Sequence, residues 1–410
     1  MENEQFTAAY RPLADKEILL GISGGIAAYK AADYLRKMKA LGAKVQVVMT
    51  ESATRFVSPL TFEALSGRPV YHHMFPSGDT NSMLHIDLAR KADLFAVLPA
   101  TANVLAKASN GVADNLLLAT ILCHSRPVLF FPSMNPAMYA NPATVDNIKS
   151  LREYGHKVIE PETGKTACGE CGKGRLPDWP LVKEAILGHL SPKDLKGLKV
   201  LVASGPTREP IDPVRFVSNR SSGKMGAAMA LVASRRGGDV TLVTGPVSLN
   251  IPPVVEIVNV ETARQMADVV KKRAEAADII IMAAAVSDYA PNQTATRKLK
   301  KSRDKIELKL VPTEDILSSL LLMRRPGQII VGFCAETGNL LENSLEKIRR
   351  KPVDILVAND VSLPGVGFDV ETNKVMIINK DEERVELPLL HKEEVAERIW
   401  DYITAHFIDT

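Results

Sequence analysis

The sequence is poor in cysteine, in net charge and in long apolar runs. Its 410 residues include only four cysteines, too few for the disulfide framework of a secreted protein, and this small number fits a reducing cytosol. The formal net charge is only +3, so the chain lacks the concentrated basic face with which proteins bind nucleic acid. We therefore expect no nucleic-acid partner, and we expect the cations to serve small anionic substrates.

Long apolar stretches are also missing, since none reaches the ~18 to 20 residues needed to span a bilayer. The run from Ile279 to Val286 is short and ends on polar residues. Residues 1–16 contain three acidic residues and no apolar core, unlike a signal peptide or a membrane anchor. We expect a cytoplasmic protein with no membrane partner.

The length of the chain favours two domains, because a single core rarely extends beyond ~250 to 300 residues. A polar segment with proline and glycine, Ser191–Gly197, follows a helix-like stretch and precedes a new apolar strand. It gives the best boundary. We predict one domain at residues 1–190 and a second at residues 191–410.

Apolar strands alternate with amphipathic helices in both halves. In the first half we expect a helix at 26–40 and strands at 18–22, 44–49, 94–98, 128–131 and 157–159. In the second half we expect a helix at 223–236, strands at 199–203, 239–244, 278–283, 328–333 and 354–357, and a hairpin at 375–378 and 386–388. The alternation predicts an α/β protein made of two doubly wound, Rossmann-like domains with mostly parallel sheets.

A glycine loop, Gly21-Ile-Ser-Gly-Gly25, follows the first strand and precedes a helix. Backbone N–H groups at that helix start, with the Ser23 hydroxyl, could hold an anion. The loop lacks the G-x-G-x-x-G spacing of a dinucleotide site, so it is either a phosphate loop or a closely packed turn. An NAD-dependent oxidoreductase is the least favoured class, because neither half has that spacing with an acid ~20 residues later.

Polar residues also follow later strands of the first half. Hydroxyls and amides at strand ends suit a phosphorylated ring system, and these segments contain Thr50, Ser52, Pro99, Ala100, Thr101 and Asn103. In Pro132–Tyr139, Asn135 offers a donor and an acceptor between Met134 and Met138. A methionine pair by itself is more often core than ligand contact.

Two residues of the first half carry titratable groups that suit catalysis. His85 precedes a strand, and a single histidine is more often structural than a general base. Cys168 lies in the glycine-rich stretch 166–175, which suits a mobile lid with a reactive thiol. Cys168 and Cys171 form one C-x-x-C pair, and no second pair completes a four-ligand zinc site.

A long connection, residues 205–226, follows the first strand of the second half and far exceeds the usual ~2 to 6 residues. Its Gly223-Lys224 is followed by Met225 rather than Ser or Thr, which argues against a Walker-type ATPase, although the turn could still present amides to a phosphate. Asp288 follows an apolar run at a turn of small residues. Ligands of open α/β sheets bind beyond such strand ends.

Basic residues recur near the later strand ends of this half. The run Arg297–Lys301 precedes Lys347 and Lys351, which are four residues apart and share a helix face. By itself the run Arg297–Lys301 is typical of a solvated basic face. With Asp288 close by in sequence, the acid and the lysines fit a site for a metal and a triphosphate.

Four segments of the first half resemble the flavin-dependent cysteine decarboxylase family: the glycine loop through Lys30, His85 in His-Ile-Asp-Leu-Ala, Asn135 and Met138 in Pro-x-Met-Asn-x-x-Met, and Cys168 in Ala-Cys-Gly-Glu. The resemblance implies a flavodoxin-like domain that binds FMN. His85 would assist the substrate, Asn135 and Met138 would grip substrate and flavin, and Cys168 would supply a late proton. The implied FMN contacts are Gly21, Ser23, Gly24, Gly25, Thr50, Ser52, Pro99, Ala100, Thr101, Asn103 and Met138.

The chain from about residue 16 to residue 399 resembles the bifunctional coenzyme A biosynthesis family, which joins that decarboxylase to phosphopantothenate–cysteine ligase. The second half matches in Gly-Pro-Thr-Arg-Glu-Pro, Ser-Asn-Arg-Ser-Ser-Gly-Lys-Met-Gly and Ala-Ala-Ala-Val-Ser-Asp-Tyr. The resemblance implies that CTP activates 4'-phosphopantothenate as an acyl-cytidylate, which cysteine then captures. The implied contacts are Asp288, Lys298, Phe333, Lys347 and Lys351 for CTP, and Arg215, Asn219 and Ala284 for the intermediate, with Asn219 and Lys298 catalytic.

The same resemblance implies Mg²⁺ on the triphosphate, for which we assign no protein ligands, and a homo-oligomer, with a dodecamer of decarboxylase trimers and ligase dimers as one arrangement. A flavin-binding regulatory protein without turnover is the alternative, and the presence of both His85 and Cys168 argues against it. The preference between CTP and ATP, feedback control, channelling and the role of Cys171 stay open.

Overall fold

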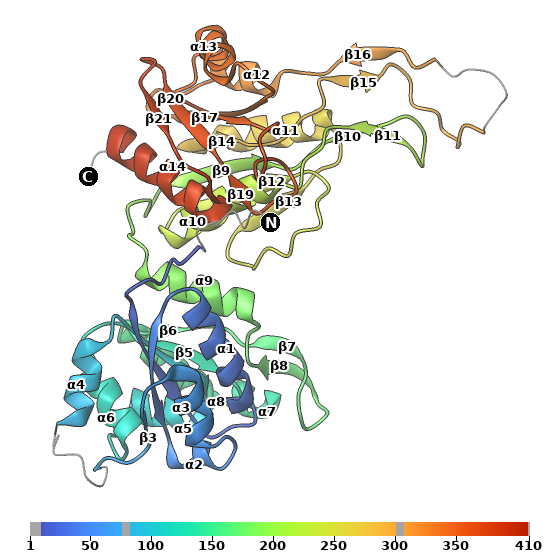
Figure 1. The fold of residues 1–410 in the computed structure, drawn as a ribbon. Helices are drawn as coiled ribbons and strands as arrows, with labels where there is room; N and C mark the ends of the chain where they lie inside the picture. The colour runs from blue at the N-terminus through green and yellow to red at the C-terminus, as the bar shows by residue number, and fades with distance from the viewer. Residues whose placement is uncertain (1–9, 76–82, 301–306, 409–410) are drawn as a thin grey trace, which may run out of the picture. The chain divides into compact units, whose positions relative to one another are not determined.

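The computed structural model describes residues 10–75, 83–300 and 307–408. The chain divides into two compact units (Figure 1). We call residues 11–190 the N-terminal unit, and residues 191–408 together with Tyr10 the C-terminal unit. No helix among the described residues is long and apolar enough to cross a membrane.

A six-stranded sheet forms the centre of the N-terminal unit, in the order β3-β2-β1-β4-β5-β6, with every neighbouring pair parallel. The strands are β1 (Glu17–Ile22), β2 (Lys44–Met49), β3 (Val70–Tyr71), β4 (Leu94–Ala100), β5 (Leu129–Pro132) and β6 (Lys157–Val158). The helices are α1 (Ala28–Ala40), α2 (Glu51–Thr54), α3 (Pro59–Ser66), α4 (Leu84–Lys91), α5 (Ala102–Ser109), α6 (Leu116–Cys123), α7 (Pro136–Ala140), α8 (Pro142–Glu153) and α9 (Trp179–Leu190). The order reverses between β1 and β4, which places a topological switch point there.

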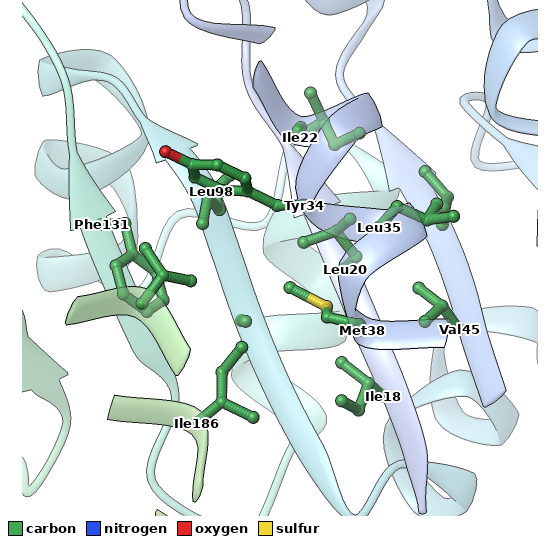
Figure 2. Close-up of a cluster of buried hydrophobic side chains, with 14 of the residues drawn as sticks. Ile18, Leu20, Ile22, Tyr34, Leu35, Met38, Val45, Leu98, Phe131 and Ile186 are labelled. Carbon is green, nitrogen blue, oxygen red and sulfur yellow. The ribbon is translucent and has the colours of Figure 1, made fainter. Parts of the chain in front are cut away.

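Successive β1 side chains point to opposite faces of this sheet, and each face is covered by helices. Leu20 and Ile22 pack with Leu35 and Met38 of α1 in the core of one face (Figure 2), which α3 and α9 also cover. On the other face, Leu19 packs in the core covered by α4, α5, α6 and α8. Burial on both faces explains why the strands are continuously apolar, as in parallel sheets.

A two-stranded hairpin contains residues 166–175, the stretch that we expected to form a mobile lid. Strands β7 (Glu162–Lys165) and β8 (Cys171–Arg175) pair antiparallel, and residues 166–170 form the tip. Thr166 N–H donates to the Glu170 carbonyl at 2.8 Å, and Gly169 has a φ of +89°. Gly169 thus allows the tight turn at the tip, whereas Gly172 and Gly174 lie within β8.

The C-terminal unit contains an eight-stranded sheet in the order β13-β12-β9-β14-β17-β18-β20-β21, parallel from β13 to β18. Its strands are β9 (Lys199–Ser204), β12 (Asp239–Thr244), β13 (Glu256–Asn259), β14 (Ile279–Met282), β17 (Ile329–Glu336), β18 (Ile355–Asp360), β20 (Val375–Asn379) and β21 (Arg384–Glu386). Strands β20 and β21 form the predicted hairpin. With both sheets described, the predicted class of two doubly wound domains is confirmed.

Helices α10 (Lys224–Arg235) and α14 (Lys392–Phe407) cover one face of this sheet. The other face is covered by α11 (Ala263–Ala274), α12 (Ile316–Leu322) and α13 (Leu340–Arg350). Two short strands, β19 (Thr372–Asn373) and β22 (Leu390–His391), pair antiparallel with each other.

Two antiparallel ribbons extend from this unit as an arm (Figure 1). They are β10 (Arg208–Pro210) with β11 (Phe216–Ser218), and β15 (Tyr289–Pro291) with β16 (Leu310–Pro312). The ribbons touch, since Ala295 N–H donates to the Ile211 carbonyl at 2.9 Å. The long connection at 205–226, for which we expected no strands, therefore contains one ribbon of this arm.

Candidate functional sites at two sheet edges

Three loops meet at the carboxyl edge of the N-terminal sheet, after β1, β2 and β4. Ser23 is fully buried, and its hydroxyl donates to the Pro99 carbonyl at 2.7 Å and accepts from Thr101 N–H at 2.9 Å. A Cβ on Gly24 would lie 2.4 Å from Ser52 Cβ, so the glycine loop touches the next loop directly. The structure thus brings together the predicted segments 21–25, 50–52 and 99–101.

Helix starts surround this junction. The Thr50 side chain caps α2 by accepting from Ala53 N–H at 3.2 Å, Thr101 is the N-cap of α5, and Asn103 is exposed in the first turn of α5. Unpaired N–H groups and the helix dipole make such starts favourable for anions. Because the Ser23 hydroxyl is hydrogen-bonded within the chain, it holds the glycine loop against the loop after β4.

Asn135 joins the hairpin of β7 and β8 to α7. Its side-chain oxygen accepts from Ala137 N–H at 2.8 Å and caps α7. Its Nδ2 donates to Glu170 Oε2 at 2.6 Å and to Cys168 Sγ at 3.3 Å. Two predicted residues, Asn135 and Cys168, are therefore in direct contact, although 33 positions separate them.

Hydrogen bonds at the hairpin tip alter the acidity of the exposed Cys168 thiol. Thr166 Oγ1 lies 3.0 Å from Cys168 Sγ. The hydrogen bond with Thr166 lowers the pKa of Cys168, and those from the Asn135 amide and the Glu170 backbone lower it further. A thiol with a lowered pKa exchanges its proton more readily near neutral pH.

A charge cluster at the surface holds the base of the hairpin and α7. Glu160 accepts from Tyr139 O–H at 2.7 Å and pairs with Lys173 at 2.6 Å and with Arg152. Burial raises the pKa of Glu160, but hydrogen bonds from Lys173, Arg152 and Tyr139 outweigh burial and lower it to about 2. Next to Tyr139, Met138 is 49% exposed and available to a ligand.

His85 lies apart from these contacts. It is partly buried in the first turn of α4. Within residues 10–75 and 83–190, no hydrogen bond or ion pair links His85 to the glycine loop, Asn135 or Cys168. Its predicted role remains a prediction.

A cleft of about 560 Å³ opens at the carboxyl edge of the C-terminal sheet. The loop after β14, the end of β17, the start of α10 and the end of α13 line it. Six predicted residues lie in its wall: Asn219, Ala284, Asp288, Phe333, Lys347 and Lys351. Asn219 Nδ2 donates to the Val286 carbonyl at 2.8 Å, which fixes the turn before Asp288.

Charges of both signs line this cleft. Lys351 is the C-cap of α13, one residue beyond its last turn, and it pairs with Asp315, the N-cap of α12. Burial raises the pKa of Asp315, but its hydrogen bonds from Lys351 and Ser318 outweigh burial and lower it. Lys347 and Asp288 complete a cationic and anionic lining suited to a polyphosphate and its counter-ion.

Lys224 and Lys392 also line the cleft, and sequence reasoning did not assign either of them. Lys392 is 4% exposed and donates to the carbonyls of Gly367 at 2.9 Å and Val370 at 2.6 Å. Burial, followed by the charge of Lys224, lowers the pKa of Lys392 to about 8. Lys224 donates to the Asp369 carbonyl at 2.8 Å, so both lysines hold one loop of the wall.

Arg215 and Lys298 lie on the arm, outside the cleft lining. Arg215 donates to Asp212 and, at 2.7 Å, to the Leu299 carbonyl, which joins the two ribbons. That guanidinium holds the pKa of Asp212 well below its usual range. Lys298 is exposed, and Lys301 of the basic run lies outside the described residues.

Among the described residues, no group of three or more His, Cys, Asp or Glu side chains could hold a metal ion. All four cysteines are free.

Comparison with known families assigns both units. Residues 7–191 match the flavoprotein family, and residues 195–407 match the DNA/pantothenate metabolism flavoprotein C-terminal domain. The chain is 45% identical over 404 residues to the coenzyme A biosynthesis bifunctional protein CoaBC of Mycobacterium tuberculosis (strain ATCC 25618 / H37Rv), covering 95% of this chain and 96% of that protein.

The chain belongs to the bifunctional CoaBC family. CoaBC of Escherichia coli (strain K12) is 41% identical over 399 residues, covering 96% of this chain and 98% of that protein. The crystal structure of a CoaBC C-terminal domain matches with 41% identity and a TM-score of 0.45, covering 52% of this chain and 97% of that chain. The sequence identities to the two CoaBC proteins and the two family matches confirm membership in the bifunctional coenzyme A biosynthesis family, with its flavoprotein N-terminal half.

Proposed function

We propose that residues 1–190 decarboxylate 4'-phospho-N-pantothenoylcysteine to 4'-phosphopantetheine with FMN, and that residues 191–410 make this substrate from 4'-phosphopantothenate, cysteine and CTP. The observation that carries the proposal is the pair of separate ligand edges in one CoaBC chain. Each edge gathers several motif residues of one activity, while His85, Arg215 and Lys298 lie outside these groups. The product of one reaction is the substrate of the other.

The carboxyl edge of the N-terminal unit fits FMN. Helix starts and hydroxyls around Ser52 and Thr101 suit its phosphate, and half-exposed Met138 offers apolar contact to its ring. When bound, FMN supplies reversible two-electron oxidation of the substrate thiol, which creates the electron sink that loss of CO₂ requires. The proposed contacts otherwise follow the segments 21–25, 50–52 and 99–103.

The chain's own side chains then orient the substrate and supply a proton. The Asn135 amide faces the hairpin tip and is placed to bind a substrate carboxylate or carbonyl. Cys168 holds a proton at Sγ, 3.3 Å from that amide nitrogen. In this scheme His85 assists the substrate. His85 must then approach the carboxyl edge of the N-terminal sheet, with whose predicted residues it forms no hydrogen bond or ion pair among the described residues.

The C-terminal cleft positions the acyl-cytidylate reaction. Lys347 and Lys351 neutralise phosphate charge, and Phe333 and Asp288 contact the CTP. Mg²⁺, to which we assign no protein ligand, would be held mainly by the triphosphate and would neutralise part of its charge. Asn219 and Ala284 line the same wall and surround the acyl intermediate. Such chemistry depends on positioning and charge stabilisation more than on covalent help from the protein.

Arg215 and Lys298 belong to this site only if the arm reaches a ligand. The arm projects from the unit, and its cations lie outside the cleft wall. We assign Arg215 to the intermediate and Lys298 to stabilising charge during attack on the phosphoryl centre. Substitution of Arg215 or Lys298 therefore tests either assignment without changing a residue of the cleft wall.

We also propose a homo-oligomer in the cytoplasm, with a dodecamer of decarboxylase trimers and ligase dimers as its arrangement. Large apolar side chains are exposed beside the glycine loop, where Ile26 is 59% exposed and Tyr29 is 61% exposed. Exposed apolar patches of this kind mark interaction surfaces.

Two half-reaction assays test the proposal. Supplied phosphopantothenoylcysteine should release CO₂ from the FMN-loaded protein without nucleotide. 4'-Phosphopantothenate with CTP and Mg²⁺, without cysteine, should release pyrophosphate, and ATP in place of CTP measures the nucleotide preference. If FMN binds and no CO₂ appears, the regulatory alternative replaces the decarboxylase assignment.

A further inference from the structure

The contact between Asn135 and Glu170 is not explained by either proposed activity. We infer that Glu170 is a positioning residue that holds the Asn135 amide in the substrate-free chain, yields it to the substrate carboxylate, and takes it back after CO₂ has left. The inference rests on the proposed decarboxylation. It adds to that function an exchange in which the Glu170 carboxylate and the substrate carboxylate bind the Asn135 amide in turn.

The donors of Asn135 are both in use. An asparagine amide has two N–H donors and one acceptor oxygen. Its oxygen accepts from Ala137 N–H at 2.8 Å, which fixes the plane of the amide at the start of α7. Its nitrogen donates to Glu170 at 2.6 Å and to Cys168 at 3.3 Å. A substrate acceptor group, such as a carboxylate, can therefore bind the Asn135 amide nitrogen only by displacing part of the hairpin tip.

A carboxylate is the substrate group best able to displace Glu170. Hydrogen bonds to an ionised acceptor are roughly twice as strong as those between neutral groups. The substrate of the proposed reaction has one carboxylate, which is the group that leaves as CO₂. Exchange of the Glu170 carboxylate for the substrate carboxylate at Asn135 therefore changes the free energy little. A neutral carbonyl competes poorly with Glu170.

The hairpin is built so that its tip can move while its base stays. At the base, Met134 N–H donates to the Gly174 carbonyl at 3.0 Å, and Lys173 pairs with Glu160 at 2.6 Å. Among the described residues, the only hydrogen bonds from the tip, residues 166–170, to the rest of the unit are those of Asn135. Release of Glu170 therefore frees the tip alone.

The exchange gives the proton donor its timing. CO₂ leaves as a neutral molecule, so after decarboxylation no substrate carboxylate competes for Asn135. Glu170 then returns, and the tip again places Cys168 Sγ 3.3 Å from the amide nitrogen, beside the position that the carboxylate has vacated. The thiol thus arrives after loss of CO₂, next to the carbon that must receive a proton.

Two inert analogues separate this exchange from a structural role. The serine analogue of the substrate keeps the carboxylate and has no thiol to oxidise, and the matching ethanolamide lacks the carboxylate. Calorimetric titration into the FMN-loaded protein should show Glu170→Gln binding the serine analogue about 3- to 10-fold more tightly than wild type, since a charged competitor has been removed. Its affinity for the ethanolamide should stay within about twofold.

Glu153→Gln is the matched control, because it removes a carboxylate from exposed α8 of the same unit, where Glu153 contacts only Lys149 at 3.9 Å among the described ion pairs. It should bind both analogues as wild type does. In turnover, Glu170→Gln should lower KM and kcat together, whereas loss of a structural support would raise KM while lowering kcat. Glu170→Ala repeats the test without a side chain that can refill the position.

Equal or weaker binding of the serine analogue by both Glu170 variants overturns the exchange. Wild-type protein that releases no CO₂ from the true substrate refutes the proposed function instead. The titrations need no turnover, so they still decide whether Glu170 competes with a carboxylate. Failure of wild-type protein to bind either analogue contradicts both.

Discussion

Substitution of Gly24 by alanine tests how tightly the glycine loop is packed. The added Cβ would lie 2.4 Å from Ser52 Cβ and 2.8 Å from the Ser52 carbonyl carbon, whereas ordinary contacts begin at 3.4 Å. One loop must therefore shift by 1.0 Å, the difference between 3.4 and 2.4 Å. The Ser52 loop cannot retreat freely, because Thr50 N–H is bound to the Ile22 carbonyl at 2.9 Å. Overpacking of this kind costs about 1 to 3 kcal/mol.

If that cost falls on the loop that receives the FMN phosphate, Gly24→Ala should weaken FMN binding about 5- to 150-fold, at 1.4 kcal/mol per tenfold. Titration of flavin-free protein, followed by quenching of FMN fluorescence, measures this affinity. Urea unfolding of the flavin-free protein supplies a second readout. Gly25→Ala is the control for unfolding, because its Cβ would lie 3.4 Å from the nearest atom, in Thr101.

Ser52→Gly in the Gly24→Ala background removes the atom in the shortest contact, so part of the lost affinity and stability should return. The reasoning is refuted if Gly24→Ala binds FMN and unfolds as wild type does. It is equally refuted if Gly25→Ala destabilises the flavin-free protein as much as Gly24→Ala.

Three further outcomes are expected. Cys168→Ser should keep FMN binding and the early oxidation but block the final protonation, so mass spectrometry should find an oxidised, decarboxylated species; normal turnover would remove the thiol from the mechanism. Because the pKa of Cys168 is lowered, its thiol is lost as pH rises through a value below the ordinary ~8.5, so decarboxylase kcat should fall with rising pH in that range, and iodoacetamide labelling of Cys168 should rise in parallel. Lys298→Ala should reduce pyrophosphate release by at least about 100-fold while sparing decarboxylation, and loss of both activities would show instead that the substitution disturbs the fold.

The regular elements were predictable because their apolar runs are long and their burial is continuous. Strand β9 and helix α10 lie within one or two residues of their predicted bounds. The ribbons β10–β11 and β15–β16 were missed because their strands are three residues each and almost none of their residues is fully buried. Such strands have no apolar alternation to reveal them.

The site residues likewise divide into those that the sequence could identify and those that it could not. Asp288 and Lys347 were identifiable because each lies in a motif or near the end of a buried strand, and the structure places both in the cleft wall. Lys392 was missed because it begins a helix far from any motif, and only folding brings it to the loop at Gly367. Glu170 could have been found as the only carboxylate of the glycine-rich hairpin tip, but its contact with Asn135 depends on tertiary structure.

The most direct measurement of the two-activity proposal is mass spectrometry of the products after the FMN-loaded protein is incubated with 4'-phosphopantothenate, cysteine, CTP and Mg²⁺. We predict 4'-phosphopantetheine with CMP, pyrophosphate and CO₂ from a single polypeptide. Accumulation of phosphopantothenoylcysteine alone would contradict the decarboxylase assignment of residues 1–190. Formation of no product from 4'-phosphopantothenate, with CTP or with ATP, would contradict the ligase assignment of residues 191–410.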